Sequence, residues 1–301
     1  MNNSKEIPQH APEEFNGAKL LGIHETGTTE WHAMRETGIG GSEIGTIMGL
    51  NPWESAFALW AKKTGQIPNP PVDNWSVRFG KAFEEPILRM WQEQNPRWEV
   101  FTTGTYQHKD LPYMHANPDA LARDTETGDW MIVEIKTARS PWTTTPPAYE
   151  AQVLHYMDVM QINYGMIVAV AGWTWEERPV DWDPWQLDAQ REAAKRFWEH
   201  LQNQIKPGWD GSKATYEAER QLHPDIEDQE VELGDLGLQL LDAQEQHEEA
   251  EKHLLAIKAE VLDTMGSAKH GLVTLDGETR RVAARQARGQ GTPWLVIKRD
   301  K

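Results

Sequence analysis

Apolar residues between positions 28 and 205 change from helical to strand spacing several times along the chain. Spacings of three and four residues predict helices near 42–49, 54–64, 80–94, 147–161 and 184–204. Shorter runs rich in β-branched and aromatic residues predict strands near 98–108, 112–122, 130–137 and 164–171. Because helices and strands follow one another in this way, we expect a mixed α/β core over residues 28–205.

Three flanking segments are predicted around this core. Residues 1–27 show no period and are expected to be poorly ordered, and residues 206–227 are expected to be a linker. Residues 228–301 form a C-terminal region, in which an apolar stripe from Leu236 to Met265 predicts one long helix. This helix could pack on the core, join subunits or dock a partner, and packing is the default. The Asp276-Gly277 pair after it predicts a β-hairpin.

The strand predicted at Trp130–Lys136 carries two polar residues in an otherwise apolar run. Glu134 and Lys136 project to the same side of this strand, because successive strand side chains alternate. If Asp119 belongs to the neighbouring strand of a hairpin, its carboxylate converges on the same point. Two carboxylates can hold a hard divalent cation and an ammonium can orient or activate a water, which suits phosphodiester hydrolysis. The alternative is a structural ion pair on a half-buried strand.

Four sequence elements resemble those of one known family. Asp119…Glu134-x-Lys136 matches the PD-(D/E)XK nuclease signature, and Pro118 is also in place. Upstream lie a Gly-rich stretch at 35–45 and a Gly-x-x-x-x-Glu-Pro element at 80–86, and downstream lies Gln-x-x-x-Tyr at 152–156. In this order they resemble the YqaJ-like viral recombinases, which include the lambda-type exonucleases.

The fold implied by the resemblance is α/β, with a PD-(D/E)XK restriction-endonuclease-like core in which helices flank a central mixed sheet. The C-terminal long helix and β-hairpin would follow it. The implied activity is that of a Mg²⁺-dependent 5′→3′ exonuclease, encoded by a phage or prophage, that degrades one strand of linear double-stranded DNA. The 3′ single-stranded overhangs would then serve homologous recombination by strand annealing.

Cofactors and partners are also implied by the resemblance. Mg²⁺, with Mn²⁺ as an alternative, would bind as two ions per active site. The partners would be double-stranded DNA ends and a single-strand annealing protein. Similar enzymes form ring-shaped trimers around DNA, so the resemblance implies a homo-oligomer of that kind.

The resemblance assigns the metal site to residues of the signature. Asp119, Glu134 and the backbone carbonyl of Ile135 would hold the metal. Lys136 would position or activate the attacking water.

The Glu-Pro match assigns a supporting role to Glu85, which would assist the metal or its water ligands. Pro86 suits the first turn of a helix, so the helix is expected to begin near Glu84. Glu84 itself is expected to be solvated. Without the resemblance, both glutamates would be solvated residues of a first turn.

Away from the metal, the resemblance assigns Arg35 and Ser42 to the 5′-phosphate of the DNA end. Gln152 would position the scissile phosphate or the water, and Tyr156 would support it by packing or a hydrogen bond. From the residues alone, the Gly-rich loop could bind a phosphate or simply be a turn in which Ser42 caps the next helix. Gln152 and Tyr156 share a helix face and could equally be ordinary surface and core residues.

Histidines and tryptophans add few candidates. His115 and His155 are expected to be structural, although His115 could touch DNA. The chain has 15 tryptophans, most of which should pack in the core. Trp53 and Trp142 are the ones predicted to contact DNA.

Composition narrows these alternatives. The 301 residues include no cysteine, which excludes disulfides, zinc-thiolate sites and iron–sulfur clusters. No apolar run reaches membrane-spanning length and the N-terminus lacks a signal-peptide pattern, so a cytoplasmic location and no membrane partner are expected.

Net charge is the main objection to a DNA-binding function. A formal charge of −17 is a poor match to DNA phosphates, but a nuclease needs only a locally positive channel. The basic residues gather near the C-terminus, which is therefore a candidate DNA contact or a plain solvated hairpin. They are Arg280, Arg281, Arg285, Arg288, Lys298 and Arg299.

Two other functions are also compatible with the sequence. The same core could be a structure- or site-specific endonuclease, because the metal triad is common to both classes. The chain could also be a non-catalytic DNA-end-binding recombination scaffold. Arg35 and Ser42 favour the exonuclease, and the intact Asp119, Glu134 and Lys136 favour an enzyme.

Overall fold

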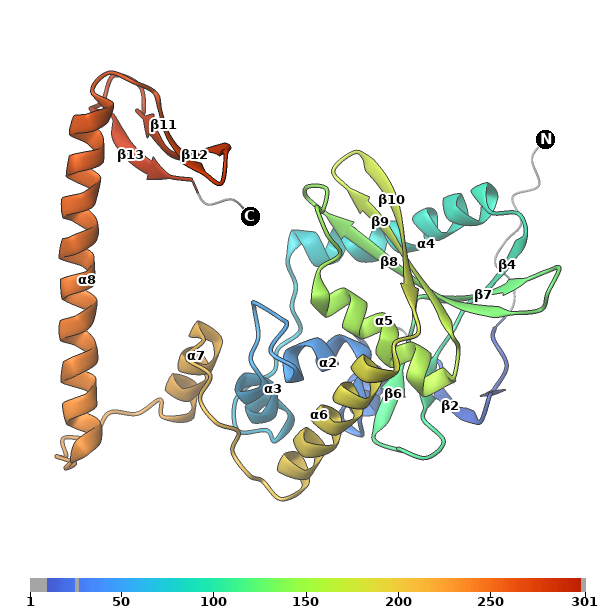
Figure 1. The fold of residues 1–301 in the computed structure, drawn as a ribbon. Coiled ribbons are helices and arrows are strands. Elements are labelled where there is room, and N and C mark those ends of the chain that lie inside the picture. Colours follow the sequence, from blue (N-terminus) through green and yellow to red (C-terminus); the bar gives the residue numbers. More distant parts are fainter. Residues whose placement is uncertain (1–9, 25–26, 299–301) are drawn as a thin grey trace. The chain divides into compact units, whose positions relative to one another are not determined.

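A mixed five-stranded sheet forms the centre of the first part of the chain (Figure 1). The computed structural model describes residues 10–24 and 27–298 and divides into two compact units, Met1–Ile226 and Glu227–Lys301. The central strands are β4 (Trp98–Phe101), β7 (Ala120–Asp124), β8 (Trp130–Ala138), β9 (Tyr164–Ala171) and β10 (Thr174–Asp181), in the order β10-β9-β8-β7-β4. β8 and β9 are parallel, and the other neighbours are antiparallel.

Helices cover both faces of this sheet (Figure 1). On one face, Trp91 of α4 (Trp75–Gln94) lies in the same buried cluster as Val133 of β8. On the other, Leu154 of α5 (Pro147–Met160), the helix that joins β8 to β9, lies in the same buried cluster as Ile132. Full burial of a side chain such as Ile132 stabilises the fold by about 2 kcal/mol. The predicted α/β class, with helices flanking a central mixed sheet, is confirmed.

A second sheet lies beside the first and is made of short strands. They are β1 (Glu14–Phe15), β2 (Ala18–Gly22), β3 (Ile39–Gly40), β5 (Thr105–Gln107) and β6 (Met114–Ala116), in the order β1-β2-β5-β6-β3. The predicted strands 98–108 and 112–122 are therefore each divided, because β4 and β7 pair in the central sheet while β5 and β6 pair in this one. Two-residue strands such as β1 and β3 carry no period that a sequence could reveal.

Along the chain, β3 is preceded by α1 (Thr29–Glu36) and followed by α2 (Gly41–Ile47) and α3 (Ala56–Lys63). Glycines let α2 approach α5 closely. A Cβ on Gly45 would lie 3.1 Å from the Cα of Ala148, and one on Gly41 would lie 2.4 Å from the Tyr156 ring. A side chain at Gly41 would overlap the Tyr156 ring and one at Gly45 would crowd Ala148, so the two glycines let α2 lie directly against α5.

The end of this unit contains two helices, α6 (Pro184–Gln202) and α7 (Lys213–Leu222). Asp183 caps α6 by accepting hydrogen bonds from the backbone of Trp185 and Gln186. The segment 206–227, expected to be a linker, instead contains α7. It packs on α3 through a 2.7 Å hydrogen bond between Thr215 Oγ1 and Ser55 Oγ.

The second unit contains a long helix, α8 (Asp235–Met265), and a three-stranded sheet of β11 (His270–Leu275), β12 (Glu278–Gln286) and β13 (Trp294–Ile297). The long helix and the hairpin on Asp276-Gly277 are confirmed, and both turn residues have positive φ. The sequence missed β13, which pairs with β12, because its apolar run is short. Of the predicted basic residues, Arg299 lies outside the described part of the chain.

Several other boundaries differ from those predicted. The N-terminal segment 1–27, expected to be poorly ordered, contains β1 and β2, while residues 1–9 and 25–26 lie outside the described residues. The sequence also missed α1 and β10. Most important for the site, α4 begins at Trp75, capped by Asn74, so Pro86 lies inside the helix rather than in its first turn.

Candidate active site

Asp119, Glu134 and Lys136 converge beside the central sheet, as the strand alternation predicts. Asp119 immediately precedes β7, and its Oδ2 accepts a 2.7 Å hydrogen bond from the backbone N–H of Ile135 on β8. Lys136 Nζ lies 2.7 Å from Glu134 Oε1. The pairing of β7 with β8 thus brings a carboxylate from one strand to a carboxylate and an ammonium on the next.

Negative charge is in excess at this point. Burial, followed by repulsion from Glu134 and Glu84, raises the pKa of Asp119 well above its ordinary value. Burial lowers the pKa of Lys136, but attraction by Glu134 and Asp119 outweighs it and the net shift is upward. Both upward shifts show that a further positive charge beside the carboxylates would be stabilised.

Gln152 and Tyr156 on α5 face the same carboxylates, as their four-residue spacing predicts. Gln152 Nε2 donates to Glu134 Oε1 at 2.7 Å and to the Tyr156 hydroxyl at 2.9 Å. Both side chains are buried. Glu134 is thus held by an amide from the helix and an ammonium from its own strand.

Glu84, rather than Glu85, lies at this site, which corrects the prediction. The Glu84 side chain lines the same hollows as Asp119 and Glu134, and burial and then Glu134 raise its pKa. Glu85 is exposed and forms an ion pair with Arg89, one turn further along α4. The cause is the buried face of α4, since Glu84 lies three and four residues before the buried Ile87 and Leu88 and shares their side of the helix. Since successive helical residues differ in direction by about 100°, Glu85 then points away from the sheet.

The Gly-rich stretch brings Arg35 and Ser42 together. Arg35 Nη2 donates to Ser42 Oγ at 3.1 Å and to Glu43 Oε1 at 3.0 Å. Ser42 is not the helix cap that the sequence suggested, because α2 already begins at Gly41. Its hydroxyl instead lies beside the guanidinium. The sequence also missed Glu43, which is buried and pairs with Lys63 at 3.2 Å.

Three connected hollows link these residues. An inner cavity of about 190 Å³ contains Asp119, Glu134 and Gln152 in its wall. It shares Trp31, Arg35 and Ser42 with an outer cavity of about 590 Å³, and it shares Glu84 and both carboxylates with a groove of about 320 Å³ along Lys136. The carboxylates and the Arg35–Ser42 pair therefore lie in one continuous depression.

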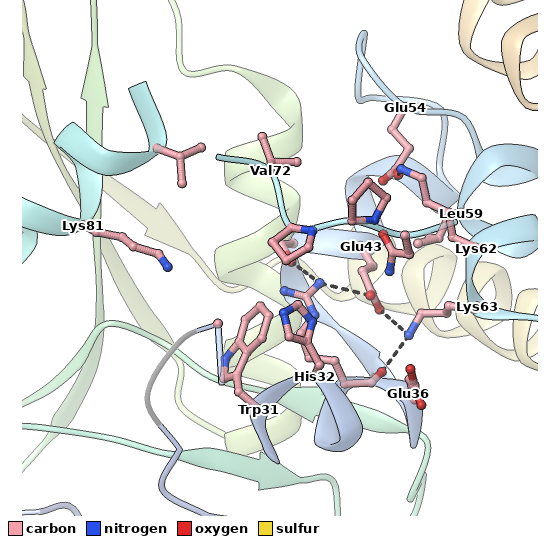
Figure 2. Close-up of a pocket in the computed structure, with 17 residues that line it drawn as sticks. Trp31, His32, Glu36, Glu43, Glu54, Leu59, Lys62, Lys63, Val72 and Lys81 are labelled. Atoms are coloured by element: carbon pink, nitrogen blue, oxygen red, sulfur yellow. Dashed lines mark hydrogen bonds and ion pairs between the residues drawn. The ribbon is translucent and has the colours of Figure 1, made fainter. Parts of the chain in front are cut away.

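The outer cavity is bordered by three lysines (Figure 2). Lys81 projects from α4 on the side opposite Lys62 and Lys63 of α3 (Figure 2). Lys62 pairs with Glu54 at 2.6 Å and Lys63 with Glu43 at 3.2 Å, but with Arg35 the wall holds four cations against three glutamates. The remaining charge makes the cavity suitable for an anionic group despite the overall acidity of the chain.

The carboxylates fit a hard divalent cation. Within residues 10–24 and 27–298, no group of three or more His, Asp or Glu side chains could hold a metal ion by itself. Asp119 and Glu134 nevertheless provide two oxygen donors in a site with excess negative charge. Mg²⁺ is commonly bound by one or two carboxylates, with water and substrate phosphate as its other ligands.

His115 and His155 have protein partners and lie in the core. His115 lines the inner cavity, and its Nε2 lies 3.2 Å from the carbonyl oxygen of Pro112. His155 Nε2 lies 3.1 Å from the carbonyl oxygen of His115. Trp53 is 78% exposed, whereas Trp142 is half-buried and packs against Tyr149.

Lowering the pH from about 6.5 to about 4 is expected to destabilise the protein through His155. Burial lowers the pKa of His155 to about 4, although Asp158 and Glu43 act in the opposite direction. The unfolded side chain titrates near about 6.5, so the contribution of neutral His155 is complete above that pH. It is lost as the pH falls toward the folded pKa, for a total of about 3 kcal/mol. Urea unfolding at several pH values measures this loss.

The matched variants are His155→Gln and His223→Gln. The first should flatten the dependence of unfolding free energy on pH. His223→Gln, at a side chain that is 74% exposed, is the comparison for loss of an imidazole at the surface. An equal slope in His155→Gln and the parent protein would contradict the assignment.

None of the described helices is both long enough and apolar enough to cross a membrane.

Comparison with known proteins identifies relatives of the chain. The family model for the YqaJ-like viral recombinase domain matches residues 30–163, which confirms the resemblance predicted from the four sequence elements. The chain is 25% identical over 257 residues to the uncharacterized protein YqaJ of Bacillus subtilis (strain 168), covering 81% of this chain and 76% of that protein. It is 30% identical over 112 residues to protein D345L of African swine fever virus (strain Badajoz 1971 Vero-adapted), covering 36% of this chain and 31% of that protein.

Among solved structures, the chain is similar to an alkaline exonuclease from Laribacter hongkongensis. The TM-score is 0.49 and the sequence identity is 18%, covering 59% of this chain and 94% of that one. A structure of the same exonuclease in complex with dAMP matches with the same values.

Proposed function

Given that residues 30–163 are a YqaJ-like viral recombinase domain, we propose that this chain is a metal-dependent DNA exonuclease. It degrades one strand of linear double-stranded DNA in the 5′→3′ direction and leaves 3′ single-stranded overhangs for recombination by strand annealing. The observation that carries the proposal is the continuous depression that joins Asp119, Glu134 and Lys136 to the Arg35–Ser42 pair. The proposed hydrolytic site is thus next to the proposed binding site for the phosphate at the end of a DNA strand.

Asp119 and Glu134 are the proposed metal ligands, with the Ile135 carbonyl as a further oxygen. Mg²⁺ is the proposed ion, Mn²⁺ the alternative, and two ions per site the proposed stoichiometry. When bound, the metal would supply Lewis acidity to the scissile phosphate and lower the pKa of a water. The carboxylates themselves are held in place by the Ile135 N–H, Lys136 and Gln152.

Lys136 and Gln152 are the proposed positioning groups for the reaction. Lys136 donates one hydrogen to Glu134 Oε1 and has two left for the water or a phosphate oxygen. Gln152 uses both amide hydrogens on Glu134 and Tyr156, so its own Oε1 is the group that can accept from the water. The water oxygen attacks phosphorus, and the P–O3′ bond to the terminal nucleotide breaks. The released 3′-oxygen takes up a proton. Tyr156 supports Gln152 through its hydroxyl.

Arg35 and Ser42 are the proposed binding groups for the 5′-phosphate of the end. An arginine with a hydroxyl beside it provides charge-assisted hydrogen bonds to phosphate oxygens. Breaking the P–O3′ bond leaves a new 5′-phosphate on the next nucleotide. Each turnover would therefore create the end that Arg35 and Ser42 bind, which favours successive cleavage.

The proposed partners go beyond this site. By resemblance, the chain forms a ring-shaped trimer around duplex DNA, works with a single-strand annealing protein and functions in the bacterial cytoplasm. The basic residues of β12 are proposed as a second contact to DNA phosphates.

Digestion of a linear duplex with one labelled end tests the proposal. The DNA carries either a 5′-phosphate or a 5′-hydroxyl, and reactions contain Mg²⁺, Mn²⁺ or EDTA. We expect metal-dependent, stepwise loss of one strand that starts faster from the 5′-phosphate. Cleavage of circular duplex would instead indicate an endonuclease, and binding of ends without cleavage would indicate a recombination scaffold.

Replacing Glu84 by Gln is expected to slow digestion about 10-fold, a typical loss for a group that supports metal ligands. Its neighbour provides the matched control, because Glu85→Gln changes an exposed residue paired with Arg89. Initial rates at saturating duplex measure both effects. A larger loss of rate in Glu85→Gln than in Glu84→Gln would instead support the sequence-based assignment to Glu85.

A further inference from the structure

Glu43 is a buried carboxylate held between two cations at the wall of the outer cavity. Only 6% of the residue is exposed. Its Oε1 accepts a 3.0 Å hydrogen bond from Arg35 Nη2, and its Oε2 lies 3.2 Å from Lys63 Nζ (Figure 2). Oε2 also accepts a 3.0 Å hydrogen bond from the Gly40 backbone. Both carboxylate oxygens are thus occupied, and the side chain has one fixed orientation.

Lys63 extends this anchoring to the backbone that carries Arg35. Its ammonium donates to the carbonyl oxygens of Arg35 at 2.7 Å and Gly38 at 2.8 Å. These contacts fix the turn between α1 and β3. The Arg35 guanidinium also lies over the Trp31 ring, at 4.7 Å from its centroid. The arginine is therefore restrained at its backbone, along its face and at one nitrogen.

The restraint uses only one of the three guanidinium nitrogens. Nη2 donates to both Ser42 and Glu43, while within the described residues Nε and Nη1 have no protein hydrogen-bond partner. Two N–H groups on one edge of an arginine match two oxygens of a phosphate. Each such edge includes Nη2, whose two hydrogens go to Ser42 and Glu43, so the donors left for a ligand are the separate N–H groups of Nε and Nη1.

The charges support this arrangement. A carboxylate beside a phosphate site would by itself repel the ligand. Glu43 is outnumbered here by Arg35 and Lys63, so the cluster keeps one net positive charge. Because Lys63 is directed at Glu43 and at backbone carbonyls, the excess charge lies on Arg35, at the cavity.

We propose that Glu43 is the positioning residue of the end-binding site, holding Arg35 so that its remaining N–H groups, on Nε and Nη1, are available to the 5′-phosphate. This inference rests on the proposed function and assigns specificity for the phosphorylated end to a residue that does not touch it. Glu43→Gln keeps the shape and the hydrogen-bonding oxygen but removes the charge that orients Arg35. The preference for 5′-phosphate over 5′-hydroxyl ends should fall about 10-fold, since a charge-assisted hydrogen bond contributes at least that much.

Fluorescence anisotropy of the full chain in EDTA tests this without catalysis. The two probes are identical duplexes that end in 5′-phosphate or 5′-hydroxyl, and the measured quantity is the ratio of their dissociation constants. Glu43→Asp, which keeps the charge on a shorter side chain, should restore part of the ratio. Asp124→Asn removes another buried carboxylate paired with an arginine, Arg97, and should leave the ratio unchanged.

Glu43→Gln leaves Lys63 without its carboxylate partner, which could unfold the protein and obscure the result. The double variant Glu43→Gln/Lys63→Met is the control for this effect. It leaves no buried charge unpaired and should also lose the preference. If the parent protein prefers phosphorylated ends and the Gln variants keep or increase that preference, the role of Glu43 is wrong while the proposed function stands. If the parent protein has no preference, end recognition by Arg35 fails and this inference fails with it.

Discussion

Replacing Asp119 by Asn should slow duplex digestion about 1,000-fold, because loss of a metal-binding carboxylate costs about 4 kcal/mol of transition-state stabilisation. The amide oxygen can still accept the Ile135 N–H, so the geometry of β7 and β8 should be preserved. The measurement is the initial rate of strand loss at saturating Mg²⁺ and duplex. Metal binding should weaken in parallel, which isothermal titration with Mn²⁺ would detect.

A measurement of thermal stability distinguishes a loss of catalysis in Asp119→Asn from a loss of folding. Without metal, Asp119 is a buried carboxylate close to Glu134 and Glu84, and its repulsion by them disappears in the amide. The Asn variant should therefore unfold at the same temperature as the parent protein or at a higher one, as is common when a functional charge is removed. Asp129→Asn, at the exposed end of the same hairpin, is the control and should change neither quantity. A digestion rate within tenfold of the parent would contradict the role of Asp119.

The convergence of Asp119, Glu134 and Lys136 could be predicted because it depends on local rules. Alternation along one strand places Glu134 and Lys136 on the same side. A hairpin between two adjacent strands then brings Asp119 opposite them. Neither step requires knowledge of distant segments.

The choice between Glu84 and Glu85 shows where local rules fail. The directions of Glu84 and Glu85 differ by about 100°, so which of them reaches the site depends on which face of α4 packs on the sheet. Pro86 suggested a start that the Asn74 cap and the packing of Trp91 override. The tertiary contacts of α4 therefore determine which carboxylate reaches the site.

Glu43 and Lys63 were missed for a different reason. Glu43 follows Gly40 by three residues, a spacing typical of a glutamate that caps its own helix, and this signal was present in the sequence. Its partner Lys63 belongs to another helix, and nothing in the sequence indicates that the two meet. The close approach of α2 to α5, which Gly41 and Gly45 permit, brings this cluster beside Gln152 and Tyr156.

Lys136→Gln is the second change with a large expected effect. Loss of a group that positions the water or the phosphate should lower the turnover rate about 100-fold or more. Duplex binding measured in EDTA should be preserved, because Arg35 and Ser42 line the inner cavity and not the groove that Lys136 lines. Lys206→Gln removes a surface lysine paired with Glu219 and is the control.

The two substitutions should differ in their effect on stability, which distinguishes the roles of the residues. Lys136 is the cation that compensates Glu134, so its removal leaves a buried carboxylate unpaired and should cost about 3 kcal/mol without metal. Added Mg²⁺ should recover part of that loss, since a ligand that binds only the folded protein stabilises it. If Lys136→Gln instead behaves like Asp119→Asn, stable but inactive, then Lys136 acts on the substrate alone. If it is unstable yet fully active when metal is bound, Lys136 is a structural counterion and the water must be positioned by another group.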